Sequence, residues 1–303
     1  MRQPRLWLAL AGVAAFIGLN LLVLVRVLDL GPPQPPRKAE TENDDTRPVV
    51  RVGVISRYAP RLTYDAYQPV MDYLNAAGTH RYELKLSTSY EDAAAQLERG
   101  DVSASFFGAW IYARVGPALG LVPVLAPRDG DGVATARAVL ITATGSGIGS
   151  VADLRGRAVA LASRNSYAAN WFLSECLPGA GLLVADLDSV HHYSHHQTVV
   201  YRVRDGHHDA GVVKEDVAQR FDDGSIRIVA RSDPYPGPPL VVRGDDDSPA
   251  LAELIALLLA LDPAEPAAAR LLAGWDNEFN RGFARVDAAT YAQARLLAGE
   301  VTP

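Results

Sequence analysis

Hydrogen-bonding side chains gather near the starts of three expected helices in this 303-residue chain. Tyr90 lies in the first turn of one helix and His196 in the first turn of another, while Ser166 and Tyr167 open the third. A phenol, a hydroxyl and an imidazole can each donate a hydrogen bond to an oxyanion. Helix starts add free backbone N–H groups and a partial positive charge. Together these features predict a binding site for a small anion.

Each of these residues also has an ordinary structural explanation. Tyr90 fits a packing role, Ser166 fits a helix cap, and His196 fits a histidine whose hydrogen bonds are satisfied at the surface. The sequence leaves these explanations open, and only the joint pattern of the three residues favours a site.

The elements that position these residues alternate along the chain from Val49 onward. Expected strands are short apolar or alternating runs, and expected helices have apolar residues three and four positions apart. The expected strands are residues 49–55, 82–89, 103–107, 136–143, 157–162, 189–194, 209–215, 226–232 and 240–244. The expected helices are residues 67–78, 89–100, 150–156, 166–177 and 195–206, and the chain from about residue 249 onward.

Two of the helices begin with a capping pattern. Ser89 is followed three residues later by Asp92, and Ser194 by Gln197, as in a capping box. The alternation of strands and helices predicts parallel sheets with helices on both faces. Two such runs predict two α/β lobes, in which ligands bind beyond the carboxyl ends of the strands.

Five segments carry a resemblance to a known protein family. They are TSYEDAAAQLERG, FFGAWIYARVG, GIGSVADLRGRAVALASRNS, SHHQTVVYRVRDGHHDAGVV and the tail GWDNEFNRGFARVDAATYAQARLL. Over roughly residues 50–300 the sequence resembles the phosphonate/phosphate/phosphite substrate-binding proteins of ABC transporters. The resemblance implies a type II periplasmic-binding-protein fold, with two Rossmann-like lobes joined by two crossover strands. It places lobe 1 at residues 49–137 plus 238–303 and lobe 2 at residues 138–237, with a small oxyanion between them.

The resemblance also implies roles for individual residues. Tyr90 matches a tyrosine that contacts the ligand, and Gly108 and Tyr112 match a Gly…Tyr pair of the family. Ser166 matches the first residue of a Ser-Thr-Ser loop that binds the phosphonate group. His196 matches the histidine that donates to the same oxygens.

The sequence departs from the family at three of these binding positions. Tyr167 and Ala168 replace the threonine and second serine of the loop, and a further tyrosine is replaced by Thr135 or Ala136. Each lost hydrogen bond to a charged group costs about 1.5–3 kcal/mol. We therefore expect Arg137 to supply charge or to be simply solvated. We also expect a larger or less charged ligand, with the Tyr167 ring as a stacking face.

The N-terminus predicts a membrane anchor. Arg2 and Arg5 precede an uncharged run at residues 6–25, which spans roughly 30 Å as a helix. The basic start favours a cytoplasmic N-terminus and a periplasmic remainder. We expect residues 1–30 to form an uncleaved anchor, with a cleaved signal peptide as the alternative. The proline- and charge-rich residues 31–48 should form a linker.

Composition limits the partners and the chemistry. The formal net charge of −6 and the lack of a basic stripe argue against nucleic acid. The single cysteine, Cys176, excludes an intramolecular disulfide. The sequence has no recognised nucleophile, phosphate-loop or zinc-protease motif, so we expect neither an enzyme nor a cofactor.

Two other functions remain open. Six of the seven histidines lie between His191 and His208, and a metal-binding protein is the alternative that this cluster offers. A tethered pair of lobes can also report ligand occupancy to a signalling partner. The expected partners are therefore a small anionic ligand, the membrane, and either an ABC permease or a signalling protein.

Overall fold

The computed structural model describes residues 45–292, 294 and 299. The described residues from Arg47 onward belong to one compact unit. The predicted anchor at residues 6–25 and most of the predicted linker at residues 31–48 lie outside the described residues. No helix within the described ranges is long and apolar enough to cross a membrane.

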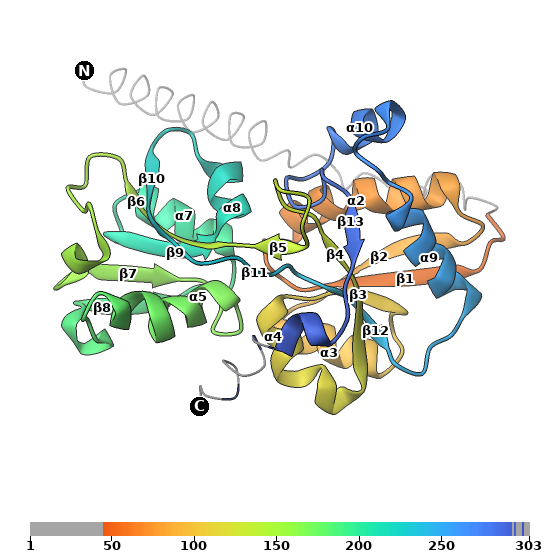
Figure 1. Cartoon of the computed structure of the whole chain (residues 1–303), viewed down its shortest axis with the longest axis horizontal. Coiled ribbons are helices and arrows are strands. Elements are labelled where there is room, and N and C mark those ends of the chain that lie inside the picture. The colour runs from red at the N-terminus through yellow and green to blue at the C-terminus, as the bar shows by residue number, and fades with distance from the viewer. Residues whose placement is uncertain (1–44, 293, 295–298, 300–303) are drawn as a thin grey trace, which may run out of the picture. The chain divides into compact units, whose positions relative to one another are not determined.

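The first sheet contains six strands in the order β13-β4-β12-β3-β1-β2 (Figure 1). Its strands are β1 (Val49–Val54), β2 (Arg81–Leu86), β3 (Ala104–Phe106), β4 (Leu121–Pro127), β12 (Leu240–Arg243) and β13 (Phe283–Arg285). β1 pairs in parallel with β2 and β3, whereas β12 runs antiparallel to β3 and β4. Strand β13 is antiparallel to β4 at the edge.

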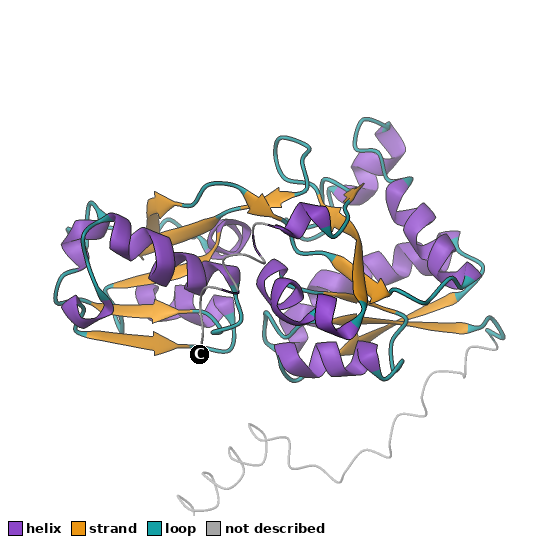
Figure 2. Ribbon diagram, turned by 60° about the horizontal axis from the view of Figure 1, so that its bottom comes forward, coloured by secondary structure: helices purple, strands orange, loops and turns teal. Residues whose placement is uncertain are grey.

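Helices cover both faces of the first sheet, as Figure 2 shows. The three buried valines of β1, at positions 50, 52 and 54, pack with Val70 and Leu74 on one face. Leu97 and Phe107 belong to the apolar cluster on the other face. The helices of this half are α2 (Pro60–Ala77), α3 (Tyr90–Glu98), α4 (Ala109–Val115), α9 (Pro249–Leu259) and α10 (Pro266–Leu272). Two 3₁₀ turns complete it, at Pro117–Leu119 and Ala289–Tyr291.

The second sheet contains five strands in the order β10-β6-β9-β7-β8. Its strands are β6 (Ala138–Ala143), β7 (Ala158–Leu161), β8 (Ser189–His192), β9 (Ala210–Lys214) and β10 (Ile226–Arg231). Its helices are α5 (Tyr167–Trp171), α6 (Leu177–Gly179), α7 (His196–Arg204) and α8 (Glu215–Phe221), with a π turn at Phe172–Cys176 and 3₁₀ turns at Val151–Leu154 and Val184–Asp186. Strand β7 is parallel to β8 and β9, whereas β6 is antiparallel to β9 and β10.

A short two-stranded ribbon lies in the sequence between the two sheets. Strand β5 (Thr135–Ala136) leads into β6, and β11 (Tyr235–Pro236) leads toward β12. The two strands are antiparallel, with Tyr235 opposite Ala136. This ribbon is hereafter the hinge ribbon, and Figure 1 shows its strands running between the two sheets. The exact lobe boundaries at residues 137/138 and 237/238 stay a prediction.

The expectation of parallel sheets is wrong for five strands. These strands pair only in the antiparallel sense, and they are β4, β6, β10, β12 and β13. The reason is visible at β12, because the chain arrives from the hinge ribbon at the carboxyl end of β3. Phe107, which follows β3, donates its backbone N–H to Pro239, which precedes β12, at 2.8 Å. A strand that enters at that end must run antiparallel to β3.

Three other expectations need correction. The first helix begins at Pro60, seven residues before the predicted Tyr67, because a proline can open a helix without losing a hydrogen bond. The cap of α7 is His195 rather than Ser194, because the start of this helix is held by contacts with the other half of the molecule. The chain after residue 249 is not all helical, since β13 completes the first sheet.

Candidate ligand-binding site

One small cavity collects all the predicted ligand-binding residues except Arg137. They are Tyr90, Gly108, Ser166, Tyr167, Ala168 and His196. Three helix starts meet there, because Tyr90, Tyr167 and His196 are the first residues of α3, α5 and α7. The cavity retains about 30 Å³ of free space, room for about two water molecules at most.

His196 is a buried, neutral imidazole. Its side chain is enclosed with only 3% of the residue exposed, and burial together with the charge of Arg57 lowers its pKa to about 3. Its Nδ1 accepts a hydrogen bond from the backbone N–H of Lys214 at 3.3 Å. The proton of the neutral ring therefore belongs on Nε2, which makes Nε2–H a donor. This environment does not match the alternative of a surface histidine.

Tyr90 and Ser166 keep their protons at neutral pH. Burial raises the pKa of the Tyr90 phenol above its ordinary value. Ser166 caps α5, because its Oγ accepts from the backbone N–H of Ala169 at 3.2 Å. A hydroxyl that accepts one hydrogen bond can still donate another. The cap explanation is thus confirmed for Ser166, and it is compatible with a role in binding.

The backbone amides at the helix starts are partly occupied. His196 donates its N–H to the carbonyl oxygen of Arg57 at 3.1 Å, and Ala169 donates to Ser166. His195 also contacts the first half of the molecule, with its Nδ1 3.0 Å from the carbonyl oxygen of Ser56. Side chains therefore supply more of the hydrogen-bond donors in this cavity, and backbone N–H groups fewer, than the sequence pattern predicted.

Two stacked tyrosines form one wall of the cavity. The rings of Tyr167 and Tyr235 lie 3.6 Å apart between centroids and are tilted by 16°. Tyr235, which lies between prolines in the hinge ribbon, is not among the residues predicted from the sequence to bind the ligand. It is paired with Ala136, one of the two positions where the family resemblance predicts a tyrosine. The stacking face expected of Tyr167 is thus occupied by a tyrosine of this chain.

A buried network of charges adjoins the cavity. Arg57 Nη1 lies 2.7 Å from Glu278 Oε1, and Lys214 Nζ lies 3.2 Å from the same oxygen. Lys214 also pairs with Asp216 at 2.9 Å. Burial lowers the pKa of Lys214, and the charges of Lys214 and Arg57 lower that of Asp216 against the opposing effect of burial. Two cations and two carboxylates thus balance each other.

These charged residues were missed in the sequence analysis. Arg57 closely follows β1 and Lys214 ends β9, so charged residues at carboxyl ends of strands were an available signal. No comparable signal marks Glu278, which is 221 positions from Arg57 in the sequence.

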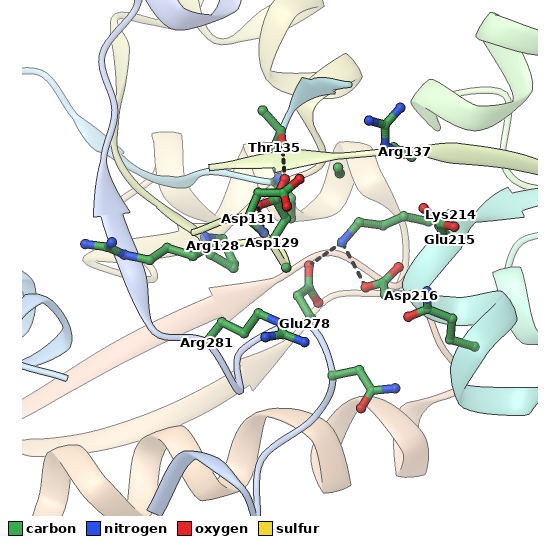
Figure 3. Close-up of a pocket in the computed structure, with 16 residues that line it drawn as sticks. Arg128, Asp129, Asp131, Thr135, Arg137, Lys214, Glu215, Asp216, Glu278 and Arg281 are labelled. Carbon is green, nitrogen blue, oxygen red and sulfur yellow. Dashed lines mark hydrogen bonds and ion pairs between the residues drawn. The ribbon is translucent and has the colours of Figure 1, made fainter. Parts of the chain in front are cut away.

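Arg137 and Tyr112 lie outside this cavity. Arg137 donates from Nη1 to the carbonyl oxygen of Ser232 at 3.0 Å and lines a neighbouring, larger cavity (Figure 3). Tyr112 is buried in edge-to-face contact with Tyr291, with centroids 5.0 Å apart. Arg137 therefore does not line the cavity that holds the other predicted residues. It lines the neighbouring cavity, and Lys214 lines both.

The histidine cluster does not form a metal site in the described part of the chain. His191 and His208 approach within 3.3 Å, but His192 bonds to the carbonyl oxygen of Ala162. His195 and His196 turn to other partners, as described above. Among the described residues no three histidine, cysteine or carboxylate side chains are grouped to hold a metal ion. The metal-binding alternative thus lacks a ligand set in these residues.

Comparisons with known proteins agree with this architecture. The family model of the periplasmic substrate-binding proteins of phosphonate ABC transporters matches residues 52–291. A binding-protein component of an ABC phosphonate transporter from Pseudomonas aeruginosa is 15% identical, with a TM-score of 0.70 over 83% of this chain and 85% of its own. PhnD1 from Prochlorococcus marinus, in complex with methylphosphonate, is 16% identical, with a TM-score of 0.71 over 84% and 98%.

A third solved structure is more similar in sequence but less similar in fold. It is a Xanthomonas citri protein bound to a chloride ion, which is 21% identical and has a TM-score of 0.62 over 83% of this chain and 96% of its own. These structures share the two-lobe α/β arrangement described above. With the family model covering most of its length, this chain belongs to the family of periplasmic substrate-binding proteins of phosphonate ABC transporters.

Proposed function

We propose that this protein captures a small oxyanion, of the phosphonate, phosphate or phosphite type, between its two lobes and delivers it to an ABC permease. The observation that carries the proposal is the convergence of Tyr90, Ser166 and His196 on one cavity. These residues come from three separate helix starts. Membership of a family of periplasmic substrate-binding proteins supports capture outside the cytoplasm and binding rather than catalysis.

Neutral donors supply the recognition. The hydroxyls of Tyr90 and Ser166 and the Nε2–H of His196 can each donate to a phosphonate oxygen. The nearby cations, Arg57 and Lys214, are already paired with carboxylates, so they stabilise an anion less than free cations do. Affinity therefore depends on the number of hydrogen bonds formed.

Binding requires a change of conformation. A phosphonate group, with its phosphorus, three oxygens and a carbon substituent, is too large for about 30 Å³ of free space. Either the lobes separate about the hinge ribbon or the stacked rings of Tyr167 and Tyr235 move apart. Both motions involve Tyr235, which belongs to the ribbon and to the cavity wall.

Removal of a single donor tests the proposal. Isothermal titration calorimetry with methylphosphonate, phosphate and phosphite should detect binding to the purified chain. Tyr90→Phe and Ser166→Ala should each weaken the best of these ligands by roughly 10- to 100-fold, because each removes one hydrogen bond to a charged group. Tyr64→Phe is the matched control, since Tyr64 is half exposed and does not line the cavity. Affinities unchanged in both site variants would overturn the assignment.

The predicted anchor would hold the captured anion near the permease. We infer that residues 6–25 keep the protein in the membrane, because this uncharged run matches the thickness of a bilayer. Alkaline carbonate extraction of membranes should leave the full chain in the pellet and release a variant that lacks residues 1–30. Release of the full chain would contradict the anchor and favour a cleaved signal peptide.

A further inference from the structure

A second cavity of about 290 Å³ adjoins the proposed ligand site (Figure 3). Lys214 and Pro238 line both cavities, so the two spaces are neighbours. Its walls come from the loop after β4, the hinge ribbon, the start of α8 and the segment that contains Glu278 and Arg281. We call this space the hinge cavity. It is large enough for a ligand substituent that the smaller cavity has no room to hold.

Two of the acids in the hinge cavity already have partners near them. Asp129 accepts from the hydroxyl of Thr135 and from the backbone N–H groups of Asp131 and Val133. Glu215 forms an ion pair with Arg231 at 2.8 Å. These two carboxylates have little capacity left for a ligand.

Two further acids in the hinge cavity belong to the buried network. Asp216 and Glu278 both contact the ammonium group of Lys214, and Glu278 also pairs with Arg57. Asp131 is the remaining carboxylate of the lining, and it is exposed on the loop after β4. Three of the five carboxylates of the lining are therefore paired with cations.

The cations of the lining are less fully used. Arg281 has no ion pair or hydrogen bond with any described residue, and Figure 3 shows its side chain extending toward the middle of the cavity. Arg128 donates only its Nε, to the carbonyl oxygen of Phe283, and Arg137 donates only Nη1, to Ser232. Figure 3 shows the guanidinium groups of Arg128 and Arg137 turned away from the other lining side chains, so of these three arginines Arg281 is the one that a ligand in this cavity can reach.

We propose that the hinge cavity holds a second anionic group of the same ligand, and that Arg281 pairs with it. The ligand class is a phosphonate that carries a carboxylate on a short carbon chain, because a guanidinium binds a carboxylate through two parallel hydrogen bonds. This inference rests on the proposed function, with the phosphonate group near Tyr90, Ser166 and His196. It makes Arg281 a specificity-determining residue.

Calorimetry of the full chain with three phosphonates tests the inference. The ligands are methylphosphonate, 3-phosphonopropionate, and 2-aminoethylphosphonate, whose distal charge has the opposite sign. The wild-type chain should bind 3-phosphonopropionate about tenfold or more tightly than methylphosphonate. Arg281→Gln should remove that advantage and leave methylphosphonate binding within about twofold of wild type. Arg285→Gln is the matched control, because Arg285 is an exposed arginine outside the cavity lining.

The outcomes separate the two proposals. Tighter binding of 2-aminoethylphosphonate than of 3-phosphonopropionate would overturn the inference, as would equal losses for both anionic ligands in Arg281→Gln. In both cases methylphosphonate binding would still support the proposed function. If no phosphonate binds the wild-type chain, this inference fails, and the titrations with phosphate and phosphite then decide whether the proposed function fails with it.

Discussion

Replacing Glu278 by glutamine should lower the free energy of unfolding by about 3–5 kcal/mol. The Glu278 side chain is only 1% exposed and balances two cations, Arg57 and Lys214. After the substitution Lys214 keeps Asp216, but Arg57 loses its carboxylate and keeps only neutral acceptors, the hydroxyl of Tyr67 at 3.0 Å and the amide oxygen of the new glutamine. A buried guanidinium without a carboxylate is costly, because burial disfavours an uncompensated charge.

Urea denaturation of the purified chain measures this loss. Glu98→Gln is the matched control, since Glu98 is exposed and has no ion pair among the described residues, and it should change the free energy of unfolding by less than about 0.5 kcal/mol. Added phosphate should stabilise Glu278→Gln more than the wild type, because the variant has an unbalanced positive charge beside the cavity. Equal free energies of unfolding for Glu278→Gln and Glu98→Gln would contradict the prediction, and would mean that water reaches the buried charges around Arg57.

Acid should destabilise the protein through His196, starting near pH 6.5. The folded protein holds the pKa of His196 at about 3, below its ordinary value of 6.5. Between these values the unfolded chain takes up a proton that the folded chain rejects. The stabilising contribution is therefore complete above pH 6.5 and declines as the pH falls. The expected slope is about 1.4 kcal/mol per pH unit, or roughly 3 kcal/mol between pH 6.5 and 4.

The substitution His196→Gln isolates this contribution. Glutamine cannot titrate, so the variant should lose the slope between pH 6.5 and 4 that the wild type shows in denaturation series. His207→Gln is the control, since His207 is exposed and not buried near Arg57. Carboxylates such as Asp216 also titrate in acid, but they are common to all three proteins and cancel in the comparison. Parallel curves for the wild type and His196→Gln would show that the folded imidazole titrates as if it were in water.

Short-range signals in the sequence were sufficient for many of the elements and for part of the site. The predicted caps at Ser89 and Ser166 both accept from a backbone N–H three residues later. Such caps depend on a few consecutive residues, as does the alternation that marks β1 or β9 as a strand. The predicted positions of Tyr90, Ser166 and His196 at helix starts followed from the same signals. The family resemblance then indicated that these helix starts belong to one site.

Contacts between distant residues decided the rest. Neither the antiparallel direction of β12 nor the pairing of Tyr235 with Ala136 is encoded in a local pattern. Arg57 and Glu278 pair across 221 positions of the sequence. Taken alone, each of these charged side chains would be expected at the exposed surface. Arg137 was expected beside the ligand, but its backbone position in the hinge region places it in the neighbouring cavity.

By itself the sequence determined two α/β halves, the helix starts and the residue types that face the small cavity. Only the tertiary structure decided which charges are buried together, how the tyrosine rings close the cavity and where a second cavity opens. The physical reason is the range of the interactions involved. Backbone hydrogen bonds and side-chain periodicity act over a few residues, whereas desolvation of a charge depends on every segment that the fold packs around it.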